Sequence, residues 1–316
     1  MGDINGLGLI NDSMGYSTVD EILITVTRLL RKVTRKADII LRLGNGEFAL
    51  ILPKTDQIRA LKMVKDLKAQ SNREKAGSFE VSVSCGLDTK VSLDTELQFT
   101  IKTALNQLIQ NKKIESTVVE NNTIALIMKM LFEKNNREML HSSRVSELCE
   151  NVALRMNFDA NTVKRIKTTG MLHDIGKIGI DEKILNKPGK LDAREWDEMK
   201  RHCEIGHRIL SASNEFSTHA EDVLKNHERM DGQGYPNGLE GQDISLVAKI
   251  ISIADTYDAL TSDRAYRFAL SEEDAILGIV DLTLNLTNSD GDILADELAL
   301  TFDGGPEAPQ AIEGPD

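Results

Sequence analysis

The short stretch HDIGK, residues 173–177, constrains this chain more than any other, because it places an imidazole beside a carboxylate with a lysine just after them. Such a pair suits iron, manganese or zinc, and the carboxylate can bridge two metal ions. A histidine whose hydrogen bonds are satisfied at a helix end is the other interpretation of one isolated His-Asp pair. The remaining histidines help to decide, since all six lie after residue 140.

Helical periodicity places several metal-competent side chains on faces that also carry apolar residues. Each of these side chains lies three, four or seven positions from apolar residues of the same predicted helix, or directly follows such residues. These candidates are His141, His173, Asp174, His202, His227 and Asp255. Burying them without a shared ion would leave too many polar groups unpaired. We therefore expect five successive helices to deliver them to one metal site, as helical bundles can do.

Local signals complete the picture of this helical part, which is expected to begin near residue 122. Asp192 and Glu195 form a capping box for one helix that continues through residues 196–209. His207 and His219 fall away from the apolar faces. We expect both of these histidines at the surface.

Residues 1–112 instead alternate strand and helix patterns, which predicts an α/β unit. Strands over 39–43 and 48–52 flank a glycine-containing turn and form a hairpin. Two later helices are expected to turn apolar rows inward, and these rows are Ile58, Leu61, Val64 and Leu67, and Leu97, Ile101, Ala104 and Leu108. The pattern begins abruptly at the first residues of the sequence.

The net charge of −12 is concentrated near the C-terminal end, where residues 281–316 hold nine acids and no lysine or arginine. The rest of the chain has no basic stripe, so we expect no duplex nucleic acid as a partner. No window is apolar enough to cross a bilayer, and no signal pattern opens the sequence. Cys85, Cys149 and Cys203 are widely spaced, which argues against a disulfide framework. A cytoplasmic protein is expected.

The N-terminal part resembles a GGDEF domain, the diguanylate cyclase fold, over residues 3–112, and this resemblance implies that the opening strand of the domain is missing. Residues 3–12, DINGLGLIND, resemble its first metal-binding loop, and residues 42–48, RLGNGEF, resemble its signature hairpin. Gly46 stands where that family has the carboxylate that holds the metal, and Gly8 where it usually has a lysine. Two-metal chemistry needs anionic ligands, so we expect no cyclase activity and a regulatory or dimerising role.

Arg35 and Asp38 occupy the RxxD position of the same family. In active relatives this position binds cyclic di-GMP as an inhibitor. Two interpretations stay open for the pair, a remnant of that inhibitory site or an exposed Arg-Asp pair at the entrance of a strand.

The helical part resembles the HD-GYP family of metal-dependent cyclic di-GMP phosphodiesterases. The motifs are HSSRV at 141–145, HDIGKIGI at 173–180, HCEIG at 202–206, HERMDGQGYP at 227–236 and ADTYDALTSDRAYR at 254–267. The resemblance implies two or three divalent transition metals, iron or manganese, bound by the six candidates above. It also implies hydrolysis of cyclic di-GMP to pGpG or GMP, with Asp174 and Lys177 catalytic and with substrate contacts from Lys177, Tyr235, Arg264 and Arg267.

Asn226 stands where the HD-GYP family usually has the first of two consecutive histidines. An amide oxygen is a poor substitute for imidazole at a transition metal. Even the loss of a group behind a ligand costs about 10–100-fold in affinity or activity. Two hypotheses follow, an active phosphodiesterase and a catalytically impaired module that senses cyclic di-GMP or recruits a partner. Other phosphoesters are further candidate substrates.

The sequence therefore predicts a two-domain α+β chain. An incomplete GGDEF-like α/β sandwich occupies residues 1–112, a linker 113–121, an all-α HD-type helical bundle 122–285, and an acidic, disordered tail 286–316. We expect cyclic di-GMP as the small-molecule partner. A homodimer is expected to form through the GGDEF-like domain or the connector.

Overall fold

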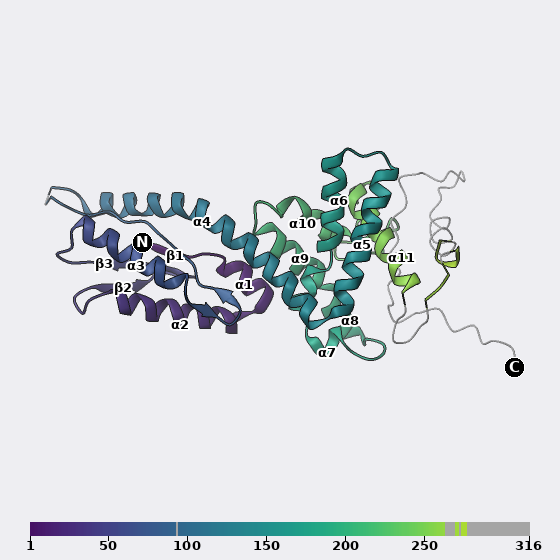
Figure 1. Cartoon of the computed structure of the whole chain (residues 1–316), viewed down its shortest axis with the longest axis horizontal. Coiled ribbons are helices and arrows are strands. Elements are labelled where there is room, and N and C mark those ends of the chain that lie inside the picture. Colours follow the sequence, from purple (N-terminus) through teal and green to yellow (C-terminus); the bar gives the residue numbers. More distant parts are fainter. Residues whose placement is uncertain (93, 263–268, 272, 277–316) are drawn as a thin grey trace. The chain divides into compact units, whose positions relative to one another are not determined.

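A four-stranded antiparallel sheet and a set of helices make up the part of the chain that the computed structural model describes, residues 1–92, 94–262, 269–271 and 273–276. This combination confirms the α+β fold class. The chain divides into two units (Figure 1). Unit 1 comprises Met1–Leu126 with Ala212–Glu215, and unit 2 comprises Ile127–Ser211 with the chain from Phe216 onward.

The sheet of unit 1 has the strand order β2-β3-β1-β6, and its pairings are antiparallel. β2 and β3 form the predicted hairpin, with Gly46 in its turn at a φ of 96°. The expectation of a missing opening strand is wrong, because the short strand β1 pairs with both β3 and β6. The strands are β1 Gly2–Ile4, β2 Ile39–Arg42, β3 Glu47–Ile51 and β6 Val83–Cys85, with a separate hairpin of β4 Lys75–Ala76 and β5 Phe79–Glu80.

Helices α1 (Leu7–Met14), α2 (Tyr16–Val33) and α3 (Gln57–Ser71) complete most of unit 1. The inward row predicted for α3 is only partly correct. α3 packs against α2 and β6 and buries Ala60 and Leu67, whereas Ile58 and Leu61 are 81% and 52% exposed. A period of 3.6 residues fixes which side chains share a face, but it does not fix which edge of that face meets the sheet.

α4 is one helix, Leu97–Lys134, that belongs to unit 1 at its start and to unit 2 at its end. Of its predicted inward row, the first two residues are exposed and the last two are buried. The structure also corrects the expectation that a new helix begins near residue 122, because residues 113–121 are helical as well. This stretch, KIESTVVEN, contains neither glycine nor proline, so nothing in it stops a helix that has already begun.

The described part of unit 2 consists of helices joined by loops, without a β-strand. Its α-helices after α4 are α5 Asn136–Arg155, α6 Ala160–Leu172, α7 Glu182–Leu185, α8 Ala193–Lys200, α9 His202–Ser211, α10 Ser217–Lys225 and α11 Leu246–Thr261, and its 3-10 helices are η1 Ile175–Gly179 and η2 Gly241–Asp243. Among the described residues, no helix combines the length and the apolarity that crossing a bilayer requires.

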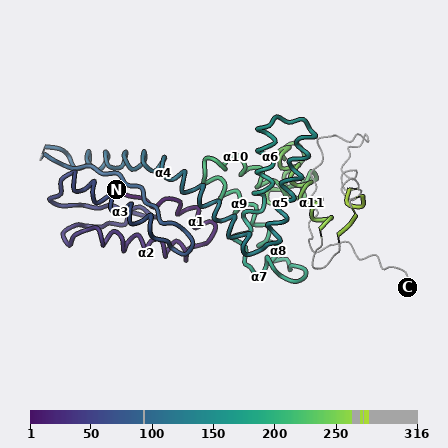
Figure 2. The backbone as a smooth tube through the Cα atoms, viewed as in Figure 1, coloured from purple at the N-terminus to yellow at the C-terminus, as the bar shows by residue number. Residues whose placement is uncertain are grey.

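The core of unit 2 lies between α5, α6 and α11. Figure 2 shows α5 and α6 side by side, joined by a short turn. Cys149 of α5, Ile166 of α6 and Ile251 of α11 are fully buried in one cluster, which also contains Ala254, the residue before Asp255. The helix faces that build this core therefore also carry the predicted metal ligands of these three elements.

The single helix predicted through residues 196–209 is divided into α8 and α9. The capping box of Asp192 and Glu195 is present at the start of α8, as predicted. At Arg201 the backbone N–H bonds to the carbonyl oxygens of Glu198 and Met199, which lie three and two residues back. This tightened turn ends α8 and lets α9 begin at His202.

Candidate metal centre

The His173-Asp174 pair lies where α6 ends and η1 begins. Asp159 caps the start of α6 with its side chain, and the helix ends one residue before His173. η1 packs directly on α9, because a Cβ at Gly176 would stand only 1.9 Å from the backbone oxygen of His202. Glycine at this position lets the backbones that carry His173 and His202 approach one another.

Four of the predicted ligands form a first cluster, defined as His141, His173, Asp174 and Asp255. His141 Nε2 lies 3.3 Å from His173 Nε2 and 3.2 Å from Asp255 Oδ1. Asp174 Oδ2 lies 3.5 Å from His141 Nε2 and 3.1 Å from His173 Nε2. Helix α5, the end of α6 and helix α11 thus bring their metal-competent atoms together, as the sequence predicts.

A second cluster is defined as His202, Cys203 and His227, whose donor atoms lie within 4.8 Å of one another. Cys203 Sγ lies 3.5 Å from His202 Nε2, and the imidazole rings of His202 and His227 are 5.0 Å apart between centroids. Asp174 Oδ1 lies 3.5 Å from His202 Nε2. The carboxylate of Asp174 therefore presents one oxygen to each cluster.

The ring nitrogens of two central histidines that face away from the clusters are already bonded. His173 Nδ1 donates to the carbonyl oxygen of Gly170 at 2.8 Å, and His202 Nδ1 donates to that of Met199 at 2.7 Å. Because a carbonyl only accepts, Nδ1 carries the hydrogen and the neutral ring keeps a lone pair on Nε2. Metal-bound histidines are oriented in this way, with the second nitrogen held by the protein.

The spacing of the donors and the unpaired polar atoms both fit divalent metal ions. Donors on one tetrahedral or octahedral ion stand roughly 3.0–3.7 Å apart, and the separations given above are 3.1–3.5 Å. Within the described residues, Asp174 Oδ1, His227 Nδ1 and both amide atoms of Asn226 are buried without a hydrogen-bond partner. Buried polar groups are nearly always paired, and a bound cation would satisfy those of these atoms that carry a free lone pair, Asp174 Oδ1 and His227 Nδ1.

The two clusters differ in how they hold protons when no metal is bound. Burial lowers the pKa of His141, but hydrogen bonds to carboxylates, that to Asp174 first, outweigh burial and hold this pKa well above its ordinary value. Burial also lowers the pKa of His173, but the charge of Asp174, the hydrogen bond to Asp174 and the charge of Asp255 together outweigh burial and raise this pKa. Burial and then the charge of His202 lower the pKa of His227 to about 3. Metal binding at the first cluster therefore competes with protons.

Lys177 lies beside the first cluster and is held by two carboxylates. Its Nζ lies 2.8 Å from Asp174 Oδ2 and 3.0 Å from Glu138 Oε2. Burial lowers the pKa of Lys177, but the charges of Asp174 and Glu138 outweigh it and raise the pKa above its ordinary value. Sequence reasoning missed Glu138. The available signal was its place three residues before His141, on the same face of α5.

Asp258 is a second residue without a predicted role. It is 3% exposed, and its Oδ2 accepts hydrogen bonds from His141 Nδ1 at 2.7 Å and from Arg144 Nη2 at 2.9 Å. Arg144 Nε bonds to its other oxygen. A carboxylate behind an imidazole fixes the orientation of the ring and which nitrogen carries the hydrogen. Helical spacing predicts that Asp258, one turn after Asp255, lies on the same side of this helix, but it does not predict the contact with His141.

Tyr235 covers the second cluster from a loop. Its ring stacks on that of His227, with centroids 4.9 Å apart and planes 20° apart, and it meets the indole of Trp196 edge-on at 6.1 Å. The fully buried carboxylate of Glu228 accepts two backbone N–H groups of the loop that follows, at 2.7 and 2.9 Å. These bonds fix the loop that carries Tyr235.

The remaining predicted residues of unit 2 have three outcomes. His227 does not lie on a helix, since α10 ends at Lys225 and His227 follows two residues later. Arg264 and Arg267 lie outside the described residues. The prediction that His219 is exposed is wrong, because it is 7% exposed. α10 packs against α6, α9 and α11, so a second face of this helix is also covered.

Arg35 and Asp38, the pair predicted as a possible remnant of an inhibitory site, belong to unit 1 and precede all residues of both clusters in the sequence. Arg35 Nη2 lies 2.9 Å from Asp38 Oδ1 and also donates to Thr55 Oγ1 at 2.5 Å. The side-chain bond to Asp38 raises the pKa of Arg35, and the same bond lowers the pKa of Asp38. The guanidinium is therefore already engaged by neighbours in this structure.

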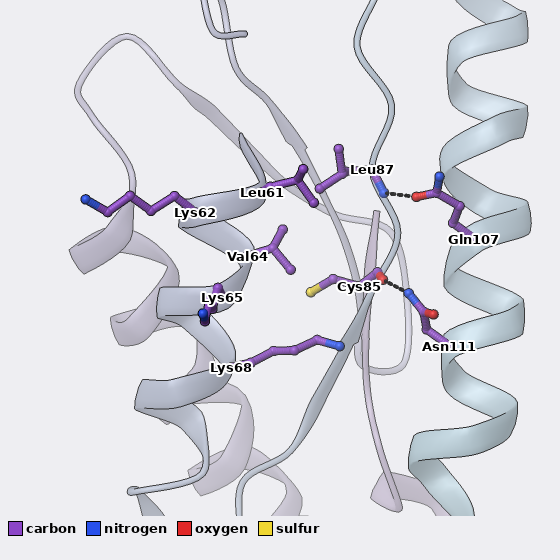
Figure 3. A pocket seen from close by; sticks show the side chains of 9 residues that line it. All are labelled: Leu61, Lys62, Val64, Lys65, Lys68, Cys85, Leu87, Gln107 and Asn111. Atoms are coloured by element: carbon purple, nitrogen blue, oxygen red, sulfur yellow. Dashed lines mark hydrogen bonds between the residues drawn. The ribbon is translucent and has the colours of Figure 1, made fainter. Parts of the chain in front are cut away.

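Unit 1 also contains a cleft of about 480 Å³ between α3, β6 and α4 (Figure 3). Lys62, Lys65 and Lys68 of α3 line one side, and Cys85 and Asn111 lie opposite, with the Asn111 amide bonded to the Cys85 carbonyl at 2.8 Å. Among the described residues, no histidine or carboxylate lines this cleft. It therefore lacks the donors of the two clusters and is not the metal centre.

Comparison with known proteins agrees with this geometry. The family model of the HD domain matches residues 125–285, and that of the diguanylate cyclase GGDEF domain matches residues 1–117. A cyclic di-GMP phosphodiesterase of Thermotoga maritima is 41% identical over 160 residues, which cover 50% of this chain and 44% of that protein. The 3'3'-cGAMP-specific phosphodiesterase 2 of Vibrio cholerae is 40% identical over 144 residues, covering 45% and 28% of the two chains.

A third relative is the cyclic di-GMP phosphodiesterase response regulator RpfG of Xanthomonas campestris, which is 38% identical over 159 residues. The match covers 50% of this chain and 42% of that protein. The matched segment is less than half of each of these three relatives. The HD domain model, in contrast, covers just over half of this chain and every residue of both clusters. The chain therefore belongs to the HD domain family.

Proposed function

We propose that unit 2 hydrolyses a phosphodiester bond of a cyclic dinucleotide, and that cyclic di-GMP is the substrate. The observation that carries this proposal is the carboxylate of Asp174, which presents one oxygen to each donor cluster. A carboxylate shared between two groups of donors suits a two-metal centre for phosphoryl chemistry. The relatives named as cyclic di-GMP and 3'3'-cGAMP phosphodiesterases support the class of substrate.

The proposed centre takes its ligands from both clusters. The six predicted ligands, His141, His173, Asp174, His202, His227 and Asp255, are proposed to hold two or three divalent transition metals. The nitrogen and oxygen donors of the first cluster suit iron or manganese. Such ions polarise phosphate oxygens and lower the pKa of water when they are bound.

The chain's own residues have separate roles in this proposal. Lys177 stands as a fixed positive charge beside Asp174 and offsets the charge that develops on the phosphate oxygens. Tyr235, stacked on His227, is placed to border the bound nucleotide. Arg264 and Arg267, which lie outside the described residues, are proposed as bidentate phosphate contacts from their motif. The expected product is pGpG, with GMP on further hydrolysis.

A purified, metal-loaded chain tests the proposal directly. We expect it to convert cyclic di-GMP to pGpG, followed by chromatography, with 3'3'-cGAMP assayed in parallel. Asp174→Ala should lose at least about 100-fold in turnover, since it removes a ligand rather than a group behind one. Asp243→Ala, at an exposed carboxylate of η2, is the control and should leave turnover unchanged. Intact dinucleotides after incubation with the loaded chain would contradict the proposal.

A cyclic di-GMP-binding module without turnover is the second candidate, and the buried, unpaired amide of Asn226 favours it. Equilibrium dialysis with cyclic di-GMP separates binding from hydrolysis. Binding without product, with product restored by Asn226→His, would select this second candidate. Turnover in the unaltered chain that Asn226→His leaves unchanged would reject it.

We further propose that unit 1, as a degenerate GGDEF-like domain over residues 1–112, regulates unit 2 rather than making cyclic di-GMP. Gly46 offers no carboxylate, and a Cβ built there would stand 2.8 Å from Leu7 Cδ2. Asp3 forms an ion pair with Lys112. The absence of cyclic di-GMP after incubation with GTP and magnesium would support an inactive cyclase, and its formation would refute it.

A homodimer through unit 1 or the connector at 113–121 is proposed on the basis of exposed apolar side chains. Leu105, Ile109, Ile114 and Val118 of α4 are 40–73% exposed. Several exposed apolar side chains along one helix can contribute to an interaction site. Sedimentation equilibrium of the unaltered chain and of Ile109→Glu would show whether the dimer exists and depends on α4.

A cytoplasmic location, an HD-type domain at 122–285 and an acidic tail at 286–316 remain predictions.

A further inference from the structure

The second cluster contains a thiol at the place where a further metal donor is needed. His202 and His227 supply two imidazoles, and Asp174 supplies one oxygen. Asn226 is fully buried next to His227, but an amide is a weak donor for transition metals beside an imidazole or a thiolate. Cys203 is also fully buried, and its sulfur belongs to the same group of donors.

The position of the Cys203 sulfur agrees with coordination to a shared ion. A tetrahedral zinc ion with Zn–S near 2.3 Å and Zn–N near 2.0–2.1 Å holds its sulfur and nitrogen donors roughly 3.5 Å apart. Cys203 Sγ lies 3.5 Å from His202 Nε2. The two donors of these neighbouring residues are therefore spaced like two ligands of one zinc ion.

Unpaired polar atoms provide an independent sign that a ligand belongs here. His227 Nδ1 and Asp174 Oδ1 have no hydrogen-bond partner within the described residues, although these residues are only 8% and 3% exposed. His227 and Asp174 both lie beside His202, the residue that precedes Cys203. A cation would satisfy both atoms, whereas the Cys203 thiol is hydrogen-bonded to His202 Nε2 and leaves both of them unpaired.

The other two cysteines lack this setting. Cys149 is packed among apolar side chains of the α5, α6 and α11 core, where burial raises the pKa of its thiol to about 12. Cys85 lies in β6 of unit 1, where burial raises the pKa of its thiol to about 11. Neither belongs to a group of potential metal donors in the described part of the chain. They are matched controls for Cys203.

We propose that Cys203 binds as a thiolate to the metal ion of the second cluster, with His202, His227 and Asp174, so that this position prefers zinc. The inference rests on the metal centre of the proposed function and deepens it. Coordination releases the thiol proton to solvent and forms one metal–sulfur bond. Thiolate favours zinc, whereas the first cluster offers only nitrogen and oxygen donors. The two positions should therefore differ in metal preference.

Cobalt substitution tests this ligand without an activity assay. The metal-free chain is titrated with Co²⁺, the bound cobalt is counted by elemental analysis, and the near-ultraviolet thiolate-to-cobalt charge-transfer band is recorded. We expect the band in the unaltered chain, in Cys149→Ala and in Cys85→Ala. Cys203→Ser should abolish the band and lower zinc affinity at least about 10-fold, while the first cluster still binds cobalt.

X-ray absorption of the unaltered chain loaded with one equivalent of zinc keeps the inference testable if Cys203→Ser does not fold. A sulfur shell near 2.3 Å is expected, and a shell of nitrogen and oxygen alone would overturn the inference. Cobalt bound without the charge-transfer band, or a band that survives in Cys203→Ser, would also overturn it while leaving the proposed function intact. A chain that binds no divalent metal would overturn both.

Discussion

At the scale of single residues, the metal centre depends on side chains that hold the ligands as well as on the ligands. Asp258 receives the Nδ1 hydrogen of His141 and is itself fixed by Arg144. Glu138 shares the ammonium of Lys177 with Asp174. These contacts determine where the ring of His141 and the carboxylate of Asp174 point before any ion arrives.

Asp258→Asn tests this orienting role. The amide keeps the volume of the side chain but weakens the charge-assisted bond that holds His141, so metal affinity should fall about 10–100-fold. Competition with a chromophoric chelator measures the affinity. Asp243→Asn, an exposed carboxylate of η2, should leave it unchanged.

Circular dichroism of the metal-free proteins distinguishes orientation from simple structural damage. If Asp258→Asn lowered the unfolding midpoint and left metal affinity intact, Asp258 would be a structural residue only. The orienting role requires that metal affinity falls while the unfolding midpoint of the metal-free protein stays unchanged.

At the scale of secondary-structure elements, η1 and α9 are the critical pair. η1 follows His173 and Asp174 directly, and α9 begins with His202 and Cys203. Gly176 allows the two backbones to touch, since any Cβ there would overlap backbone atoms of α9. Glycine at position 176 is therefore required for the close approach of the segments that carry the two clusters.

Gly176→Ala should therefore damage both stability and metal binding. The overlap with backbone atoms cannot be relieved by turning a side chain, so we expect a loss of about 1–3 kcal/mol or more in unfolding free energy. Urea denaturation followed by far-ultraviolet circular dichroism measures it. Gly8→Ala is the control, because a Cβ at Gly8 meets nothing within 4 Å. Equal stability of the two variants would refute the contact's importance.

At the scale of the whole molecule, the two units differ in how they depend on metal. The described residues of unit 2 place two donor clusters and several unpaired polar atoms in its interior. The core of unit 1 includes apolar residues of α2 and of the sheet. A ligand that binds only the folded state stabilises the part that binds it.

Metal removal should therefore lower the unfolding free energy of unit 2 alone. Zinc or manganese at about 100 times its dissociation constant should add about 2.7 kcal/mol to the unfolding free energy of unit 2. Differential scanning calorimetry with and without chelator measures the shift. Asp174→Ala should show a much smaller metal-dependent shift, and a shift in that variant equal to that of the unaltered chain would contradict the assignment.

Sequence reasoning identified the first cluster because helical spacing links each ligand to an apolar face. It did not find the break between α8 and α9, which arises from backbone bonds at Arg201. It placed His219 at the surface, because one helix pattern cannot show that several neighbours cover α10. Cys203 was counted only as a cysteine, since its role depends on how the chain folds around His227.

The single tryptophan of the chain, Trp196, meets the ring of Tyr235 edge-on. Because Tyr235 in turn stacks on His227, the indole stands two aromatic contacts from the second cluster. The intrinsic fluorescence of Trp196 therefore reports on the surroundings of the second cluster. Stopped-flow fluorescence on unlabelled protein can time the arrival of metal and of nucleotide as separate kinetic phases.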